Sequence, residues 1–132
     1  HSGDYDFSFS GLKTAFLTAY KKLGLDPSSL ATSCLAYELQ EAITDSLVIK
    51  TLAAAKEYKP KSIVLAGGVA ANKILRQKLL ASTSHLQPSV KLYIPPTKLC
   101  TDNAAYIAAS AYYNNHPLPI NQIEADPSLT LS

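Results

Sequence analysis

The stretch between Pro27 and Pro60 most constrains what this chain can fold into, because it contains no glycine and no further proline to break a helix. Its apolar residues recur at helical spacing as Leu35, Leu39, Ala42, Ile43, Leu47, Ile49 and Leu52. We therefore expect a helix over about residues 30–58, with the serines before it available as caps. At ~1.5 Å per residue this helix is on the order of 40 Å long, more than an ordinary domain of this size requires.

The rest of the chain alternates short apolar runs with helical patterns. We expect strands at residues 6–10, 62–66 and 91–94, and helices at about 12–23, 70–81 and 101–113. This order predicts an α/β fold in which two strands are parallel neighbours joined by a crossover helix. Two or three strands make a thin sheet, and the sequence contains no methionine, so we expect the chain to be part of a longer protein.

Composition indicates a globular chain, since 47% of the residues are hydrophobic and 17% are charged, which excludes a disordered protein. The length of 132 residues suits one domain, which we place at residues 1–116, with an irregular tail at 117–132. No apolar run approaches ~18 residues, so we expect no membrane partner. Two distant cysteines, Cys34 and Cys100, do not make a disulfide framework, which favours a reduced, cytoplasmic location.

Basic residues gather in one part of the chain, although the net charge is only +2. They are Lys50, Lys56, Lys59, Lys61, Lys73, Arg76 and Lys78. Two interpretations remain open: these side chains lie on separate solvated helix faces, or they form one basic flank that faces phosphates.

A glycine pair stands between a predicted strand and a predicted helix in the segment IVLAGGVAANKILR (63–76). Without Cβ atoms, Gly67 and Gly68 let a ligand approach the backbone, and the helix start offers unpaired N–H groups to an anion. Asn72, expected in the first turn of the helix, can grip a hydroxyl or an amide of such a ligand. The alternative is a tight structural joint with Asn72 as an ordinary polar residue, since neither the GxGxxG nor the Walker spacing is met.

A second joint, CTDNAA (100–105), follows the prolines 95 and 96 and opens the last predicted helix. We expect Thr101 or Asp102 to cap that helix. The alternative makes Asp102 a metal ligand at the carboxyl end of a strand, where ligands bind in open α/β sheets. One aspartate does not hold a transition metal alone, so further ligands must come from elsewhere. Cys100 is expected to be a small buried residue rather than a nucleophile.

A third segment, SFSGLKT (8–14), turns at Gly11 into a helix that carries Lys13. The residues alone favour a strand-to-helix corner, with Lys13 available for an ion pair or for a phosphate. No Ser/His/Asp or Cys/His triad follows from the spacing of the sequence.

Taken together, DFSFSGLKTA (6–15), IVLAGGVAANKILR (63–76) and CTDNAAYIA (100–108) resemble the carboxyl-terminal motifs of the TsaD family. The family was also called Gcp or YgjD and was once labelled O-sialoglycoprotein endopeptidase. The match covers nearly the whole chain in order and spacing, and the AGGVAAN form resembles bacterial or organellar members. The resemblance implies that the chain is the carboxyl-terminal lobe of an actin-like, sugar-kinase-type fold.

The resemblance also implies an activity, which moves a threonylcarbamoyl group from threonylcarbamoyl-adenylate to N6 of the adenosine next to the anticodon of a tRNA. By motif position, Asn72 matches the substrate-binding asparagine, and Gly67 and Gly68 match the glycines beside the nucleotide. Asp102 matches the metal-binding aspartate, and Lys13 the lysine of SFSGLKT. The implied cofactor is one divalent metal ion, iron or zinc. The implied partners are tRNA, other proteins of the threonylcarbamoyladenosine pathway and a second copy of the chain, in the cytoplasm or, in a eukaryote, an organelle.

The sequence departs from the family in two respects. The paired HxxxH metal ligands of the family are not in this sequence, and Tyr106 stands where methionine is usual. We therefore expect the chain alone to be inactive, because one carboxylate will not retain the metal.

Other functions stay open on the residues alone. The glycine-pair joint equally suits the carboxyl-terminal lobe of an actin-like, ATP-dependent kinase, although the CTDN motif argues against it. A metallopeptidase would need an HExxH-type zinc site, which the sequence lacks. A non-catalytic module could instead assemble or dimerise through the long helix and an open sheet edge.

Overall fold

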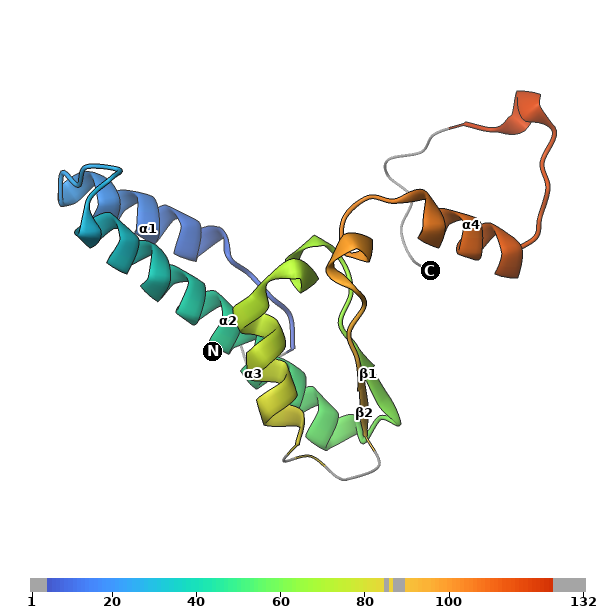
Figure 1. Cartoon of the computed structure of the whole chain (residues 1–132), viewed down its shortest axis with the longest axis horizontal. Helices are drawn as coiled ribbons and strands as arrows, with labels where there is room; N and C mark the ends of the chain where they lie inside the picture. The colour runs from blue at the N-terminus through green and yellow to red at the C-terminus, as the bar shows by residue number, and fades with distance from the viewer. Residues whose placement is uncertain (1–4, 85, 87–89, 125–132) are drawn as a thin grey trace. The chain divides into compact units, whose positions relative to one another are not determined.

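The computed structural model describes residues 5–84, 86 and 90–124, and the chain divides into two compact units after Thr101 (Figure 1). The first unit contains α1 (Ser10–Lys22), α2 (Leu30–Tyr58), β1 (Ser62–Val64), the 3-10 turn η1 (Gly68–Ala71), α3 (Lys73–Thr83), β2 (Lys91–Tyr93) and the 3-10 turn η2 (Thr97–Leu99). The second contains α4 (Ala104–Tyr113) and the 3-10 turn η3 (Ile120–Gln122). The predicted class, helix-rich α/β with a small sheet, is confirmed.

The long helix predicted between the two prolines is confirmed as α2. Ser29 caps its start, because the serine hydroxyl accepts a hydrogen bond from the Thr32 backbone N–H at 3.1 Å. The helix ends at Tyr58, and its C-cap Lys59 adopts a left-handed conformation with φ 46° directly before Pro60. Both bounds follow from local signals, a hydroxyl cap at the start and a proline that disfavours a helical residue before it.

The strand predicted at residues 6–10 is wrong. Residues 6–9 lie in irregular structure, and Ser10 already belongs to α1. The Phe9 carbonyl accepts a hydrogen bond from the Lys13 N–H at 3.0 Å, which starts the helix earlier than expected. The rings of Phe7 and Phe9 stack on each other with centroids 6.2 Å apart. Alternation of aromatic residues makes a strand only where a neighbouring strand supplies hydrogen bonds.

The sheet consists of β1 and β2, which pair in parallel with Ile63 opposite Leu92. The chain between them passes through α3, so the predicted crossover topology is confirmed. Ile63 and Leu92 are half-buried, whereas Val64 is 67% and Tyr93 54% exposed. Within the first unit the sheet therefore buries one face.

The core lies between α2, α3 and the inner face of the sheet (Figure 1). Val48, Leu75 and Leu79 are its buried centre, and Leu47, Leu52, Leu65 and Leu92 pack around them. Burying a leucine side chain contributes about 1.5–3 kcal/mol, so these few residues supply much of the stability of the unit. They also fix α3 against α2, and with it the turn that precedes α3.

The second unit begins at Asp102 and is built around α4, whose ten residues are all exposed. The predicted helix starts at Ala104 rather than Thr101, and its cap is Asn103 rather than Thr101 or Asp102. Residues 114–119 and 123–124 are irregular around η3, and the predicted tail beyond residue 124 lies outside the described part of the chain. Among the described residues, no helix has the length and apolarity needed to cross a membrane.

Candidate functional site

Gly67 and Gly68 lie where the chain leaves β1 and enters η1. Gly67 has φ 83° and ψ 176°, a combination that glycine alone adopts without strain. Gly68 has no such backbone requirement, and a Cβ built on it meets no described atom within 4 Å. Conformation explains Gly67, whereas neither conformation nor crowding within the described residues explains Gly68.

Asn72 ends this turn as the N-cap of α3, not as a residue of the first helical turn as predicted. Its Oδ1 accepts hydrogen bonds from the backbone N–H groups of Ile74 at 2.9 Å and Leu75 at 3.1 Å. Its Nδ2 donates to Oε1 of Gln40 on α2 at 3.2 Å. The half-buried side chain of Asn72 therefore fixes the turn to two helices, which leaves one Nδ2 hydrogen for a ligand.

A cavity of about 160 Å³ lies beside Asn72, between α2 and η1. It is lined by Ala36, Leu39, Gln40, Ile43, Thr44, Val69 and Asn72. Gln40 was not among the residues that the sequence singled out. The only signal for it was its place on α2, since its contact with Asn72 joins residues far apart in the chain.

Arg76, one helical turn after Asn72, holds the other side of the glycine turn. Its Nε donates a hydrogen bond to the Ala70 carbonyl, and its Nη2 donates to the Pro95 carbonyl at 2.8 Å and to Cys100 Sγ at 3.0 Å. Cys100 is buried, as predicted, with 4% of its surface exposed. In the sequence, Arg76 stood out only as one member of a basic stretch, so its contacts with these segments were not predicted.

Lys78, also from that basic stretch, points instead to α2. Its Nζ donates to Asp45 Oδ1 at 2.6 Å, to Glu41 Oε2 at 2.8 Å and to Thr44 Oγ1 at 3.0 Å. The Asp45 carboxylate, and after it that of Glu41, raises the pKa of Lys78 above its ordinary value of 10.5. A single basic flank is therefore wrong for Arg76 and Lys78, whose charged groups are engaged inside the unit.

Lys13 lies exposed on α1, which packs beside the amino-terminal half of α2 (Figure 1). The groove between these helices, of about 370 Å³, is lined by Leu12, Ala15, Phe16, Ala19, Leu35, Glu38, Leu39 and Ala42. Leu39 also lines the cavity beside Asn72. Lys13 and the glycine turn thus belong to different elements, α1 and η1, which both lie against α2.

Asp102 lies exposed at the start of the second unit, where its Oδ1 accepts a weak hydrogen bond from the Tyr106 hydroxyl at 3.4 Å. In the part of the chain that the structure describes, no three His, Cys, Asp or Glu side chains gather in a way that would hold a metal ion. Iron and zinc need several such donors, so these residues do not complete a site for either metal.

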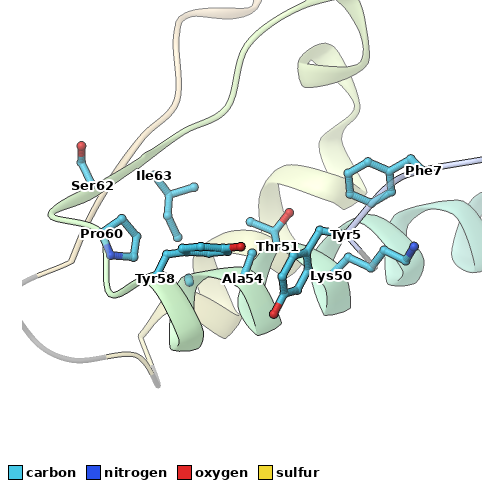
Figure 2. A pocket seen from close by; sticks show the side chains of 10 residues that line it. Tyr5, Phe7, Lys50, Thr51, Ala54, Tyr58, Pro60, Ser62 and Ile63 are labelled. Atoms are coloured by element: carbon cyan, nitrogen blue, oxygen red, sulfur yellow. The ribbon is translucent and has the colours of Figure 1, made fainter. Parts of the chain in front are cut away.

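A further hollow of about 340 Å³ lies at the carboxyl end of α2 and contains none of the predicted site residues (Figure 2). It is lined by Tyr5, Phe7, Lys50, Thr51, Ala54, Ala55, Tyr58, Pro60, Ser62 and Ile63. Tyr5 and Tyr58 meet edge to face with centroids 5.9 Å apart, and Lys50 Nζ lies 5.7 Å from the Phe7 ring centroid. A hydrogen bond to Glu57 raises the pKa of Tyr5 above 10.0. These contacts hold the segment before α1 against α2.

Comparison with known proteins agrees with the three motifs. The family model TsaD, described as tRNA N6-adenosine threonylcarbamoyltransferase, matches residues 1–109. A protein with that name from Enterococcus faecalis is 42% identical to this chain over 96% of its length. Its counterparts from Geobacillus kaustophilus and Thermosipho melanesiensis are 46% and 47% identical, each over 98% of the chain. The chain spans 37–38% of the length of these relatives. By motif, by family model and by relatives, the chain belongs to the TsaD family.

Proposed function

We propose that this chain forms one side of the donor site of a tRNA N6-adenosine threonylcarbamoyltransferase. The whole reaction transfers a threonylcarbamoyl group from threonylcarbamoyl-adenylate to N6 of the adenosine next to the anticodon, and AMP leaves. Because the chain spans little more than a third of its relatives, the remaining contacts to donor and tRNA would come from outside it. The proposal includes an actin-like carboxyl-terminal lobe, a location in the cytoplasm and assembly with other proteins of the pathway.

The observation that carries the proposal is Gly68. Nothing in its own conformation, and no described atom within 4 Å, requires a glycine there, while the space beside it is open. A missing Cβ at an exposed turn lets the backbone of η1 approach a flat or charged group closely. The N–H groups at this turn suit the phosphate or ribose of an adenylate.

The side chains around the turn would orient such a ligand. Asn72 is held by Gln40 and by α3, so its remaining Nδ2 hydrogen has a fixed direction toward a ribose hydroxyl or a base acceptor. Lys13 is proposed to approach a phosphate from α1. Asp102 is proposed as one ligand of the metal ion that the family implies, although the described residues do not complete a site for it.

The proposal is tested by titrating the chain with AMP and following the amide signals of Gly67 and Gly68 by NMR. Gly68→Ala should change the free energy of unfolding by less than about 0.5 kcal/mol, yet abolish the AMP-dependent shifts, because the methyl group occupies the approach path. Gly11→Ala is the matched control, since Gly11 also has open space at its Cβ position but lies in α1. Equal AMP affinity in wild type and Gly68→Ala would contradict the proposed site.

The chain on its own should transfer no threonylcarbamoyl group to tRNA, since it is proposed to offer one side of the donor site and its described residues hold an incomplete set of metal ligands. Transfer of the threonylcarbamoyl group, labelled in its threonine part, from threonylcarbamoyl-adenylate to tRNA measures this. Turnover above the protein-free background would show that the chain needs no further part.

A further inference from the structure

We propose that Arg76 is a positioning residue that joins the glycine turn to the carboxyl end of β2 and so holds the turn in its binding geometry. The structural part of this proposal stands on the hydrogen bonds of Arg76. Its consequence for a ligand rests on the proposed function.

The guanidinium of Arg76 reaches three segments that are separate in sequence. Nε bonds to Ala70 in η1, and Nη2 bonds both to Pro95 after β2 and to Cys100 after η2. The planar guanidinium presents several N–H donors in a fixed fork, so one side chain can fix the mutual position of several acceptors. A lysine at this position has a single ammonium group and cannot reproduce that arrangement.

The Ala70 carbonyl needs such a partner. Ala70 is fully buried, with 0% of its surface exposed, and it belongs to a four-residue 3-10 turn that ends when Asn72 turns out of helical geometry, with ψ 118°. A buried backbone carbonyl without a donor costs free energy, so the Arg76 Nε–H stabilises the turn at the point where the helical hydrogen bonds stop.

The place of this link in the fold gives it a role in binding. Because β1 and β2 are parallel, their carboxyl ends lie at the same edge of the sheet, and ligands bind at this edge in open α/β folds. The glycine turn follows β1 and Pro95 follows β2, so Arg76 spans that edge. Gly67 has no side chain with which to fix itself, which makes the external link from Arg76 more important.

Lys78 provides a matched comparison within the same helix. It too is a cation of α3, but its partners Asp45, Glu41 and Thr44 all lie on α2. Removing Lys78 therefore removes a charge and several hydrogen bonds from α3 without touching the glycine turn or the residues after β2.

The first experiment measures amide hydrogen exchange in Arg76→Ala, Arg76→Lys and Lys78→Ala. In Arg76→Ala, exchange at residues 67–71 and 97–100 should be about tenfold faster than in wild type, while the amides of the α3 core change little. In Arg76→Lys the exchange rates of these segments should lie between those of Arg76→Ala and wild type. In Lys78→Ala the exchange rates of both segments should equal those of wild type. Unchanged exchange in Arg76→Ala, or equal acceleration in Lys78→Ala, overturns the proposal. If Arg76→Ala does not fold, Arg76→Lys decides in the same way.

The second experiment follows AMP binding through the Gly67 and Gly68 amide signals. Arg76→Ala should weaken AMP binding by about tenfold, and millimolar methylguanidinium should restore it, whereas ammonium at equal ionic strength should not. A loss of affinity that methylguanidinium does not restore contradicts a positioning role. If wild type binds no AMP, the proposed donor site fails, and the exchange result alone still decides whether Arg76 holds the turn.

Discussion

Two strand-to-helix joints in this chain are built from the same parts in the same order. Each has a three-residue strand, a 3-10 turn and an asparagine N-cap, which lead to α3 in one joint and to α4 in the other. Asn72 Oδ1 and Asn103 Oδ1 each accept two hydrogen bonds from backbone N–H groups of the helix that follows. The local sequence therefore gives both joints the same capping chemistry.

The joints differ in what packs against them. The first is led by Gly67 and continues into a helix whose Leu75 and Leu79 are only 2% and 3% exposed. The second is led by Pro96, and every residue of its helix is exposed. Capping sets where a helix begins, but burial fixes the joint in space. In the first unit the candidate ligand-binding turn is held on two sides, while Asp102 stands on an exposed turn.

The largest expected difference concerns the two helices themselves. Leu75→Ala should lower the free energy of unfolding by about 2–5 kcal/mol, because it opens a cavity in the small core between α2 and α3. Ile107→Ala, at a residue of α4 that is 61% exposed, should cost less than about 0.5 kcal/mol. Urea unfolding followed by circular dichroism measures both. Similar losses would show that the second joint is as well packed as the first.

Removing the two asparagine caps should change the free energy of unfolding by smaller and unequal amounts. Asn103→Ala loses one cap and should cost about 0.5–1 kcal/mol, while Asn72→Ala also loses the bond to Gln40 and should cost about 1–2 kcal/mol. Asn72→Asp keeps the acceptor and loses only the Nδ2 donor, so it should recover most of the cap. Thermal unfolding of the three variants gives the order of their stabilities. A larger loss of stability in Asn103→Ala than in Asn72→Ala would reverse the comparison between the two joints.

The ion pairs of Lys78, which tie the helix of the first joint to α2, predict a pH dependence. Since the folded state raises the pKa of Lys78 above its ordinary 10.5, the pairs stabilise the fold fully below pH 10.5 and less as the pH rises through the folded-state pKa. Wild type should therefore be more stable than Lys78→Met at neutral pH, with a difference that shrinks above pH 10.5. If the difference in stability between wild type and Lys78→Met did not change with pH, it would come from the packing of the side chain and not from its ion pairs.

The smallest effect is expected at Asp102. The chain should retain far less than one iron or zinc ion per molecule after dialysis, and Asp102→Asn should change neither metal content nor stability, because a single exposed carboxylate is a weak ligand. Elemental analysis by mass spectrometry provides the measurement. Stoichiometric metal that is lost in Asp102→Asn would mean that further ligands gather around this turn.

The sequence predicted best where one segment carries its own signals. The bounds of α2 followed from a continuous apolar stripe, a serine cap and Pro60, and the parallel pairing of two strands followed from short apolar runs, although the strands predicted at 62–66 and 91–94 end earlier, at Val64 and Tyr93. The strand at residues 6–10 failed because alternation does not reveal whether a partner strand exists. The caps of α3 and α4 were misplaced because several polar residues stand near each of these helix starts, and the choice among them depends on where the 3-10 turn ends.

The contacts of the candidate site could be predicted least. Arg76 meets residues 6, 19 and 24 positions away, and Gln40 meets Asn72 across 32 positions. Such meetings follow from tertiary packing, not from local spacing. The motif resemblance located the glycine turn and Asn72, yet it did not show which neighbours hold them. The binding roles of Gly67, Gly68, Asn72, Lys13 and Asp102 all stay predictions.

The parallel register of the sheet has a consequence for the order of folding. It pairs Ser62 with Lys91, so the two strands meet only when the long segment between them closes into a loop. Closing that loop costs chain entropy. The hydrogen bonds within α2 and within α3 are local, whereas those of the sheet are all non-local, so the sheet edge with its glycine turn should form after these two helices. Pulse-labelling of amides during refolding should show protection in α2 and α3 before β1. In the folded chain the same late-forming edge would then open more readily than α2 and α3.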